Sequence, residues 1–102
     1  MLAHVRLSAE EADRAYQALL GDVSVMLACG LIHGDLSSYN ILYHQGRPRI
    51  IDLPQAVDLD DALDGWSLFY RDLANLAGYF TRMGLAVDPM ADAVRLWKRY
   101  IR

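Results

Sequence analysis

The longest regular pattern in the sequence is the run of apolar residues between Ser8 and Gly30. They recur at steps of three and four positions, the spacing of one face of an α-helix, and they are Ala12, Ala15, Tyr16, Leu19, Leu20, Val23, Met26 and Leu27. Ser8 and Glu11 have the spacing of a capping box, in which each side chain satisfies a free backbone donor at a helix start. Gly30 provides a stop at the other end. We therefore predict one amphipathic helix over residues 9–28, weakened in its middle by Gly21.

Two further helices are predicted in the second half of the chain. Apolar spacing resumes at Trp66 and ends near Gly84, in a pattern formed by Trp66, Leu68, Phe69, Leu73, Leu76, Ala77 and Phe80. Asp88 and Pro89 are the residue types of a helix cap and a first helical position, so a last helix should follow them. Its inner face would consist of Ala93, Val94, Trp97, Tyr100 and Ile101. The acidic segment 57–64 lacks such periodicity, and we expect it to remain on the surface.

Two short β-type runs lie between the first and second helices. They are residues 40–43 and 49–52, and residues 44–48 between them suit a hairpin turn with Gly46 in the tight position. Residues 34–38 are polar and turn-prone, which predicts a loop. The 102 residues are enough for one small domain. The predicted fold class is therefore α+β and mainly α, with three main helices, a small β-hairpin and a loop before it.

Charge and composition exclude several classes of function. The formal net charge is −3 and the 10 Lys and Arg residues are scattered, so we expect no direct contact with nucleic acid. No apolar stretch reaches the roughly 18 residues of a membrane span, and the first residues lack the apolar run of a signal peptide. We therefore expect a cytoplasmic protein without membrane attachment. Cys29, the one cysteine, has apolar neighbours and is predicted to be a buried thiol.

The residues that carry chemistry stand in the stretch His33-Gly34-Asp35-Leu36-Ser37-Ser38-Tyr39-Asn40, with Asp52 following after the hairpin. Phosphoryl transfer from ATP needs a carboxylate that orients and deprotonates the attacking hydroxyl, and oxygen ligands that hold Mg²⁺. Asp35, Asn40 and Asp52 are groups of these kinds. Residues 35–40 can present two of them on one side of a loop, and the hairpin returns Asp52 beside them. We therefore predict that Asp35 and Asp52 face each other across one shallow cleft.

Taken singly, each of these residues also has an ordinary structural role. Asp35 can cap a turn, Asn40 can form a local side-chain turn, and Asp52 can end a strand. No second histidine stands at metal-ligand spacing from His33, so we interpret His33 as a brace for the loop.

The order of the residues resembles the kinase set H-x-D-x-x-x-x-N followed by a metal-binding aspartate, with Gly34 where most protein kinases have arginine. The segments His-Gly-Asp-Leu-Ser-x-Tyr-Asn-Ile-Leu and Ile-Asp-x-Pro-Gln are similar to the RIO family of atypical serine/threonine protein kinases. Leu53 stands where that family usually has phenylalanine. The resemblance covers most of the chain, from the helix before the loop to Arg71, Asp72 and Asn75 in the next helix.

This resemblance implies catalytic residues, cofactors and partners. Asp35 and Asp52 would be catalytic, with Asp52 also open to transient phosphorylation during ATP hydrolysis. Asn40 and Asp52 would be the Mg²⁺ ligands. Ser37 would stand where many kinases have a phosphate-contacting lysine, so that Ser37 and Asn40 form the cofactor-binding set for Mg²⁺ and ATP. The partners implied are ATP and a protein substrate or a ribosome-maturation partner.

Nothing in the sequence matches the glycine-rich loop of kinases, their β3 lysine or its glutamate partner. We therefore interpret residues 1–102 as the carboxy-terminal lobe of a RIO-like domain with the amino-terminal lobe absent, inactive unless such a lobe is supplied in trans. Because 54% of the residues are apolar, the surface near Leu42 that this lobe would cover should be exposed and should favour self-association. In kinases a buried helix acid commonly supports the catalytic loop, and Asp72 either has this role or forms a surface pair with Arg71.

Three functions are compatible with the sequence. The first is a RIO-type protein serine/threonine kinase or ATPase. The second is a small-molecule kinase of the aminoglycoside or choline type, which shares His-Gly-Asp and a later Ile-Asp, although Ser37, Tyr39 and Pro54-Gln55 argue against it. The third is a non-catalytic remnant or binding module that keeps the lobe fold without turnover.

Overall fold

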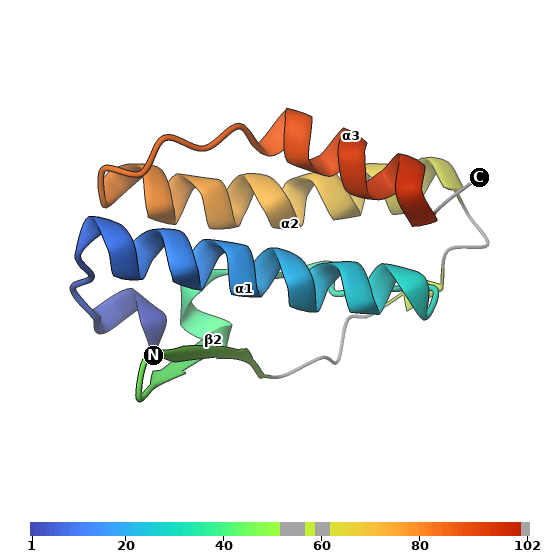
Figure 1. Ribbon diagram of the computed structural model, residues 1–102. Helices are drawn as coiled ribbons and strands as arrows, with labels where there is room; N and C mark the ends of the chain where they lie inside the picture. The colour runs from blue at the N-terminus through green and yellow to red at the C-terminus, as the bar shows by residue number, and fades with distance from the viewer. Residues whose placement is uncertain (52–56, 59–61, 101–102) are drawn as a thin grey trace.

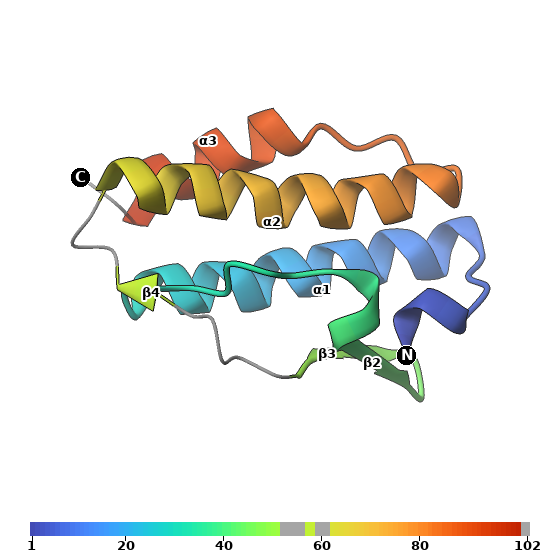
Figure 2. The same ribbon diagram turned by 180° about the vertical axis from the view of Figure 1, so that it is seen from behind.

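Three α-helices make up more than half of the residues that the structure describes. The computed structural model describes residues 1–51, 57–58 and 62–100, and the helices are α1 (Ala9–Ala28), α2 (Ala62–Arg82) and α3 (Pro89–Tyr100). α1 and α2 lie side by side, and α3 packs mainly on α2 (Figures 1 and 2). A small hairpin lies along the opposite edge of the molecule from α3, against α1. The arrangement confirms the mainly helical fold and the three predicted helices.

The starts of α1 and α3 follow the predicted capping signals. The backbone N–H of Glu11 donates to Ser8 Oγ at 3.1 Å, and the Ser8 N–H donates to Glu11 Oε1 at 3.0 Å, which completes the capping box. At α3, the Ala91 N–H donates to Asp88 Oδ1 at 3.0 Å. Local polar groups therefore fix where these two helices begin.

The predicted hairpin is present with a tighter turn than expected. Strands β2 (Ile41–His44) and β3 (Arg47–Ile50) pair antiparallel, with His44 opposite Arg47. The turn consists of Gln45 and Gly46, which have φ angles of 52° and 78°, and two consecutive positive φ values are the requirement of a type I′ hairpin turn. The prediction of a turn over residues 44–48 was wrong, because the strands continue to His44 and Arg47.

A second pairing was not predicted. Strand β1 (Leu31–Ile32) pairs antiparallel with β4 (Val57–Asp58), which lies inside the acidic segment that we expected to form a surface loop. Each strand has two residues, so neither leaves an alternating pattern that could be read from the sequence. This short ladder joins the end of α1 to the chain before α2.

The core holds the loop region at both of its ends. Ile32 of β1, Leu36 of the loop and Ile41 of β2 are 2%, 0% and 0% exposed, and they join a cluster with the inner residues of all three helices. Two 3₁₀-helices, η1 (Leu2–His4) and η2 (Ser38–Asn40), pack against each other beside β2. The hydrophobic core therefore anchors the segment that carries the candidate residues.

Three details of the sequence interpretation were wrong. α2 begins at Ala62 rather than near Trp66. Cys29 is exposed, because the C-cap position of α1 lies on the opposite side of the helix from buried Leu27. In α3, Tyr100 at the last turn is exposed and Leu96 is buried instead, since Leu96 follows buried Ala93 by three positions on the same face. Ile101, also predicted to face inward, lies outside the described residues.

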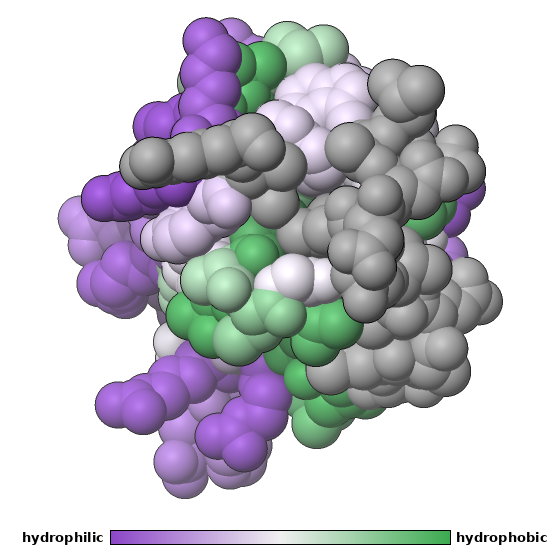
Figure 3. All heavy atoms as spheres, turned by 90° about the vertical axis from the view of Figure 1, so that its right-hand side faces the viewer, coloured by the Kyte–Doolittle hydropathy of each residue, from purple (hydrophilic) through white to green (hydrophobic). Residues whose placement is uncertain are grey.

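Exposed apolar side chains occur near the end of α1 and on the hairpin. Figure 3 looks at the end where α1 finishes and shows hydrophobic side chains gathered beside the grey residues. At this end Val25 of α1 is 63% exposed and Leu31 of β1 is 43% exposed. Leu42 of the hairpin is also 43% exposed. Its neighbours on the same face, His44, Arg47 and Arg49, are polar, so an extended apolar surface there stays a prediction. Among the helices that the structure describes, none has the length and apolarity needed to cross a lipid bilayer.

Candidate active site

The candidate loop runs from His33, just after β1, to Asn40, just before β2. His33 is 3% exposed, and its Nδ1 accepts the backbone N–H of Asp35 at 3.1 Å. An acceptor Nδ1 places the ring proton of a neutral imidazole on Nε2. His33 therefore fixes the backbone of Asp35, which is the bracing role predicted for it.

Asp72 of α2 binds the loop backbone from inside the core. Its Oδ2 accepts the N–H of Gly34 and its Oδ1 accepts the N–H of Leu36, both at 2.9 Å. The Asp72 side chain is 2% exposed, and this burial raises the pKa of its carboxyl, although the two backbone N–H groups act in the opposite direction. These bonds confirm that Asp72 supports the loop rather than forming a surface pair with Arg71.

Two neighbours on α2 bind the carbonyl groups of the same two loop residues. Arg71 Nη2 donates to the Gly34 carbonyl, and Asn75 Nδ2 donates to the Leu36 carbonyl at 3.1 Å. The N–H and C=O groups of Gly34 and Leu36 are thus all bound by side chains of one helix. Gly34 has a φ of 88°, a left-handed conformation that favours glycine. The loop conformation is therefore set on both sides of Asp35.

This arrangement leaves the Asp35 side chain exposed to solvent. The flanking residues Gly34 and Leu36 are buried, so the fixed backbone turns only the carboxylate between them outward. An accessible carboxylate on a fixed backbone suits a group that orients a substrate hydroxyl.

Asn40 closes the other end of the loop. Its Oδ1 accepts the Ser37 N–H at 2.8 Å, and its Nδ2 donates to the Asp35 carbonyl at 2.8 Å. Ser37 Oγ accepts the Tyr39 N–H at 3.2 Å. The structure therefore brings three of the four predicted residues together, Asp35, Ser37 and Asn40, in one hydrogen-bonded ring. Asp52, the fourth, lies outside the described residues, and its position opposite Asp35 stays a prediction.

Arg71 and Asn75 are the parts of the site that we did not predict as loop-binding residues. Asn75 follows Arg71 by four positions and Asp72 by three, so it is a neighbour of both on the helix surface. This spacing of polar residues within an otherwise apolar helix is the sequence feature that could have identified them. It does not show which loop the residues bind, because the two bonded segments are separated by 36 to 39 positions.

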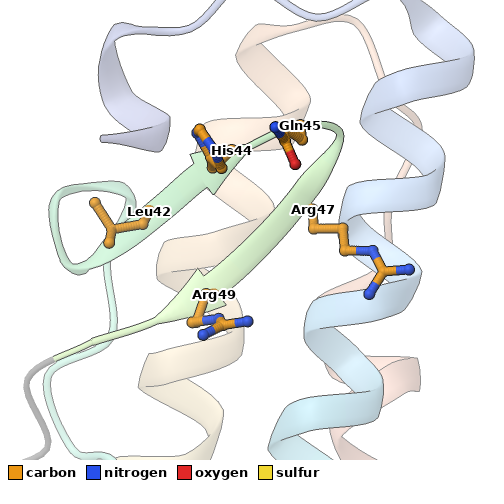
Figure 4. Close-up of a pocket in the computed structure, with 5 residues that line it drawn as sticks. All are labelled: Leu42, His44, Gln45, Arg47 and Arg49. Carbon is orange, nitrogen blue, oxygen red and sulfur yellow. The ribbon is translucent and has the colours of Figure 1, made fainter.

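A pocket of about 670 Å³ opens on the hairpin that follows the loop. Its lining residues are Leu42, His44, Gln45, Arg47 and Arg49 (Figure 4). Leu42 and His44 belong to β2, and Arg47 and Arg49 belong to β3. Because side chains alternate between the faces of a strand, these four share the outer face of the hairpin. This face combines an apolar side chain with two guanidinium groups.

Among the residues that the structure describes, no three His, Cys, Asp or Glu side chains gather into a metal site. The metal ligands predicted here are an amide and a carboxylate, and of these only Asn40 is described. Its Oδ1 accepts one N–H and retains a second lone pair. An oxygen of this kind suits Mg²⁺ as one ligand among several. Asn40, the predicted ligand that the structure describes, is therefore chemically compatible with the metal.

Comparisons with known proteins match most of the chain. The family model described as the RIO domain matches residues 1–93. Serine/threonine-protein kinase RIO1 of Chaetomium thermophilum is 44% identical over 64 residues, which are 63% of this chain and 12% of that protein.

Two further relatives cover more of the chain. RIO-type serine/threonine-protein kinase Rio1 of Thermoplasma acidophilum is 35% identical over 80 residues, 78% of this chain and 41% of that protein. The protein of the same name from Haloferax volcanii is 36% identical over 87 residues, 85% of this chain and 29% of that protein. The chain thus corresponds to less than half the length of these three relatives.

Proposed function

The chain belongs to the RIO-type kinase family, and we propose that it forms the catalytic-loop part of a protein serine/threonine kinase that uses ATP and Mg²⁺. The observation that carries the proposal is the support of the loop by α2. Asp72 binds the N–H groups on both sides of Asp35, so the Asp35 side chain is exposed while the backbone that carries it is held in place. Positioning of this kind supplies a large part of catalysis in phosphoryl transfer, where the protein forms few bonds to the reacting atoms.

In the proposed reaction, Asp35 orients the hydroxyl of the protein substrate and accepts its proton. Mg²⁺, when bound, neutralises charge on the ATP phosphates. Asn40 and Asp52 would hold it through their side-chain oxygens. Asn40 also keeps the loop closed through its bonds to Ser37 and Asp35, so one side chain would link the metal to the position of the base.

Ser37 and the pocket on the hairpin are the proposed contacts for the nucleotide. Ser37 stands on the loop between Asp35 and Asn40, and we propose that it lies near the transferred phosphate. Leu42 follows Asn40 by two residues and is 43% exposed in the pocket, which suits an apolar surface beneath adenine. An amino-terminal lobe, in trans or in a longer chain, would supply the phosphate clamp and cover this surface.

The substrate class that we propose is a protein, with a ribosome-maturation partner as the family analogy suggests. Asp52 could also take up phosphate transiently if the reaction is ATP hydrolysis. The relatives are all named as protein kinases of the RIO type, which favours this reading over a small-molecule kinase. The third hypothesis, a binding module without turnover, is distinguished from a kinase by the test below.

The test is reconstitution of phosphoryl transfer. The 102-residue chain is assayed with Mg²⁺ and radiolabelled ATP, alone and with the separately expressed amino-terminal lobe of the Thermoplasma acidophilum relative. We expect ATP turnover or phosphorylation of protein only in the mixture, and its loss in Asp35→Asn. Asp13→Asn, an exposed acid of α1, is the matched control and should retain activity.

Two results would contradict the proposal. Equal activity of Asp35→Asn and the unaltered chain would show that Asp35 is not the catalytic base. Assembly with the lobe without nucleotide turnover would favour the binding-module reading instead.

A further inference from the structure

The face of α2 that holds the candidate loop continues to Tyr79. At about 100° per residue, Asp72, Asn75 and Tyr79 lie within about 60° of one another around the helix. Asp72 and Asn75 bind the loop, whereas Tyr79, about two turns beyond Asp72, binds the chain near its start. One polar strip of α2 therefore contacts two segments that are far apart in the sequence.

Tyr79 fixes the backbone around η1. Its hydroxyl donates to the Leu2 carbonyl at 2.5 Å and lies 3.3 Å from the Val5 carbonyl. The Leu2 carbonyl also accepts the Val5 N–H at 3.1 Å, so both of its lone pairs are used. Tyr79 is 7% exposed, and burial raises the pKa of its hydroxyl, which stays a neutral donor at physiological pH. Without this hydroxyl, a buried carbonyl would lose one of its two partners.

The segment that Tyr79 fixes in turn contacts the loop. η1 packs against η2, which contains Asn40, and against β2. At the surface the rings of His4 and Tyr39 meet edge to face, with centroids 6.0 Å apart and planes at 81°. Tyr39 immediately precedes Asn40, whose side chain closes the loop. The loop thus has a second support, which reaches it from α2 through η1.

We propose that Tyr79 is a positioning residue for the loop that carries Asp35 and Asn40, acting through η1 and the contact between His4 and Tyr39. The significance of this role for catalysis rests on the proposed function, whereas the mechanical coupling does not. Any interaction that displaces residues 2–5 would then reach Asn40, so the start of this chain becomes a place from which the candidate active site can be regulated.

Hydrogen exchange measured by NMR on the 102-residue chain tests the coupling. The reporters are the backbone N–H groups of Ser37, Tyr39 and Asn40, each of which is hydrogen-bonded inside the loop. We expect Tyr79→Phe, which removes only the hydroxyl, to speed their exchange about fivefold to tenfold, the effect of losing one hydrogen bond.

Tyr16→Phe is the matched control. The Tyr16 hydroxyl also makes a 2.5 Å bond, to Asp92 Oδ2, and Tyr16 is likewise buried, but this bond joins α1 to α3. Tyr16→Phe should therefore lower stability without a selective effect on the three loop reporters. His4→Ala is a second probe that leaves the core intact because His4 is exposed, and it should speed exchange at Tyr39 and Asn40.

The proposal is wrong if Tyr79→Phe speeds exchange only at His4 and Val5 and leaves the loop protected as in the unaltered chain. It is equally wrong if Tyr79→Phe and Tyr16→Phe speed the loop reporters by the same factor, because the effect would then be global. Should Tyr79→Phe fail to fold, unchanged loop exchange in His4→Ala would refute the coupling through the ring contact. None of these exchange measurements depends on catalysis. Failure of the proposed kinase function would appear only in the reconstitution assay, so the two proposals can fail independently.

Discussion

Replacing Asp72 with alanine should destabilise the protein more than the loss of any exposed acid. The change removes the acceptor of two buried backbone N–H groups, those of Gly34 and Leu36. Leaving a buried donor unsatisfied costs about 1–3 kcal/mol. Relief from burying a charge offsets part of this cost, so we expect a loss of about 2–4 kcal/mol in the free energy of unfolding.

Asp72→Asn provides a graded comparison. The amide keeps one oxygen acceptor, while its NH₂ group faces the other backbone donor, so one N–H is left unsatisfied and the expected loss is about 1–3 kcal/mol. Urea unfolding followed by circular dichroism measures both variants, with Asp13→Ala as the exposed control. A loss for Asp72→Ala within about 0.5 kcal/mol of the control, the range of ordinary surface substitutions, would refute the loop-support argument.

The raised pKa of Asp72 also predicts a pH dependence. Burial puts the pKa of this carboxyl above its ordinary value of 3.8, so between the two values the folded state binds more protons than the unfolded state. The contribution of Asp72 to stability is therefore full below the unfolded pKa and declines as the pH rises through the folded pKa. The free energy of unfolding in urea is measured for the unaltered chain and for Asp72→Asn as the pH rises from the unfolded to the folded pKa. The value for the unaltered chain minus that for Asp72→Asn should decline over this pH interval. A difference that grows with pH would contradict the direction of the shift.

Three further outcomes are expected. Gly34→Ala should cost about 1–2 kcal/mol in urea unfolding because φ at this position is 88°, whereas Gly21→Ala, inside α1 at an open position, should be neutral or stabilising. Calorimetry should show weak or no binding of Mg²⁺-ATP to the isolated chain, since the phosphate clamp of a kinase is not among its motifs, and micromolar affinity would contradict this. Light scattering should show concentration-dependent self-association that an added amino-terminal lobe reduces; a strict monomer would argue against an exposed docking surface at Leu42.

The sequence was sufficient where the controlling interactions are local. The bounds of α1 followed from apolar spacing and from Ser8 and Glu11, whose side chains do cap its start. The Gly46 turn was identified because a positive φ favours glycine. The same logic failed at the start of α2, because residues before Trp66 have no apolar periodicity that would indicate a helix.

Tertiary interactions account for what the sequence could not show. The pairing of β1 with β4 joins two-residue strands, and nothing in Leu31 or Ile32 identifies its partner. Asp72 was recognised as a candidate support only through the kinase resemblance, and its two bonds arise because α2 packs beneath the loop. The Asn40 amide was predicted as a metal ligand, yet its described contacts close the loop. Its part in metal binding stays a prediction, as does that of Asp52.

The support of the loop by α2 also has a consequence for how the protein folds. Gly34 and Asp72 are 38 positions apart, so the loop cannot acquire its final conformation until the chain has been synthesised to the middle of α2 and this helix has docked. Pairings of such long range form late, because the chain between them must first be closed into a loop. During synthesis, the Asp35 segment therefore emerges from the ribosome well before the helix that shapes it. A nascent or misfolded chain would carry every residue of the motif without the geometry, so the loop becomes ordered only in a molecule that has finished folding.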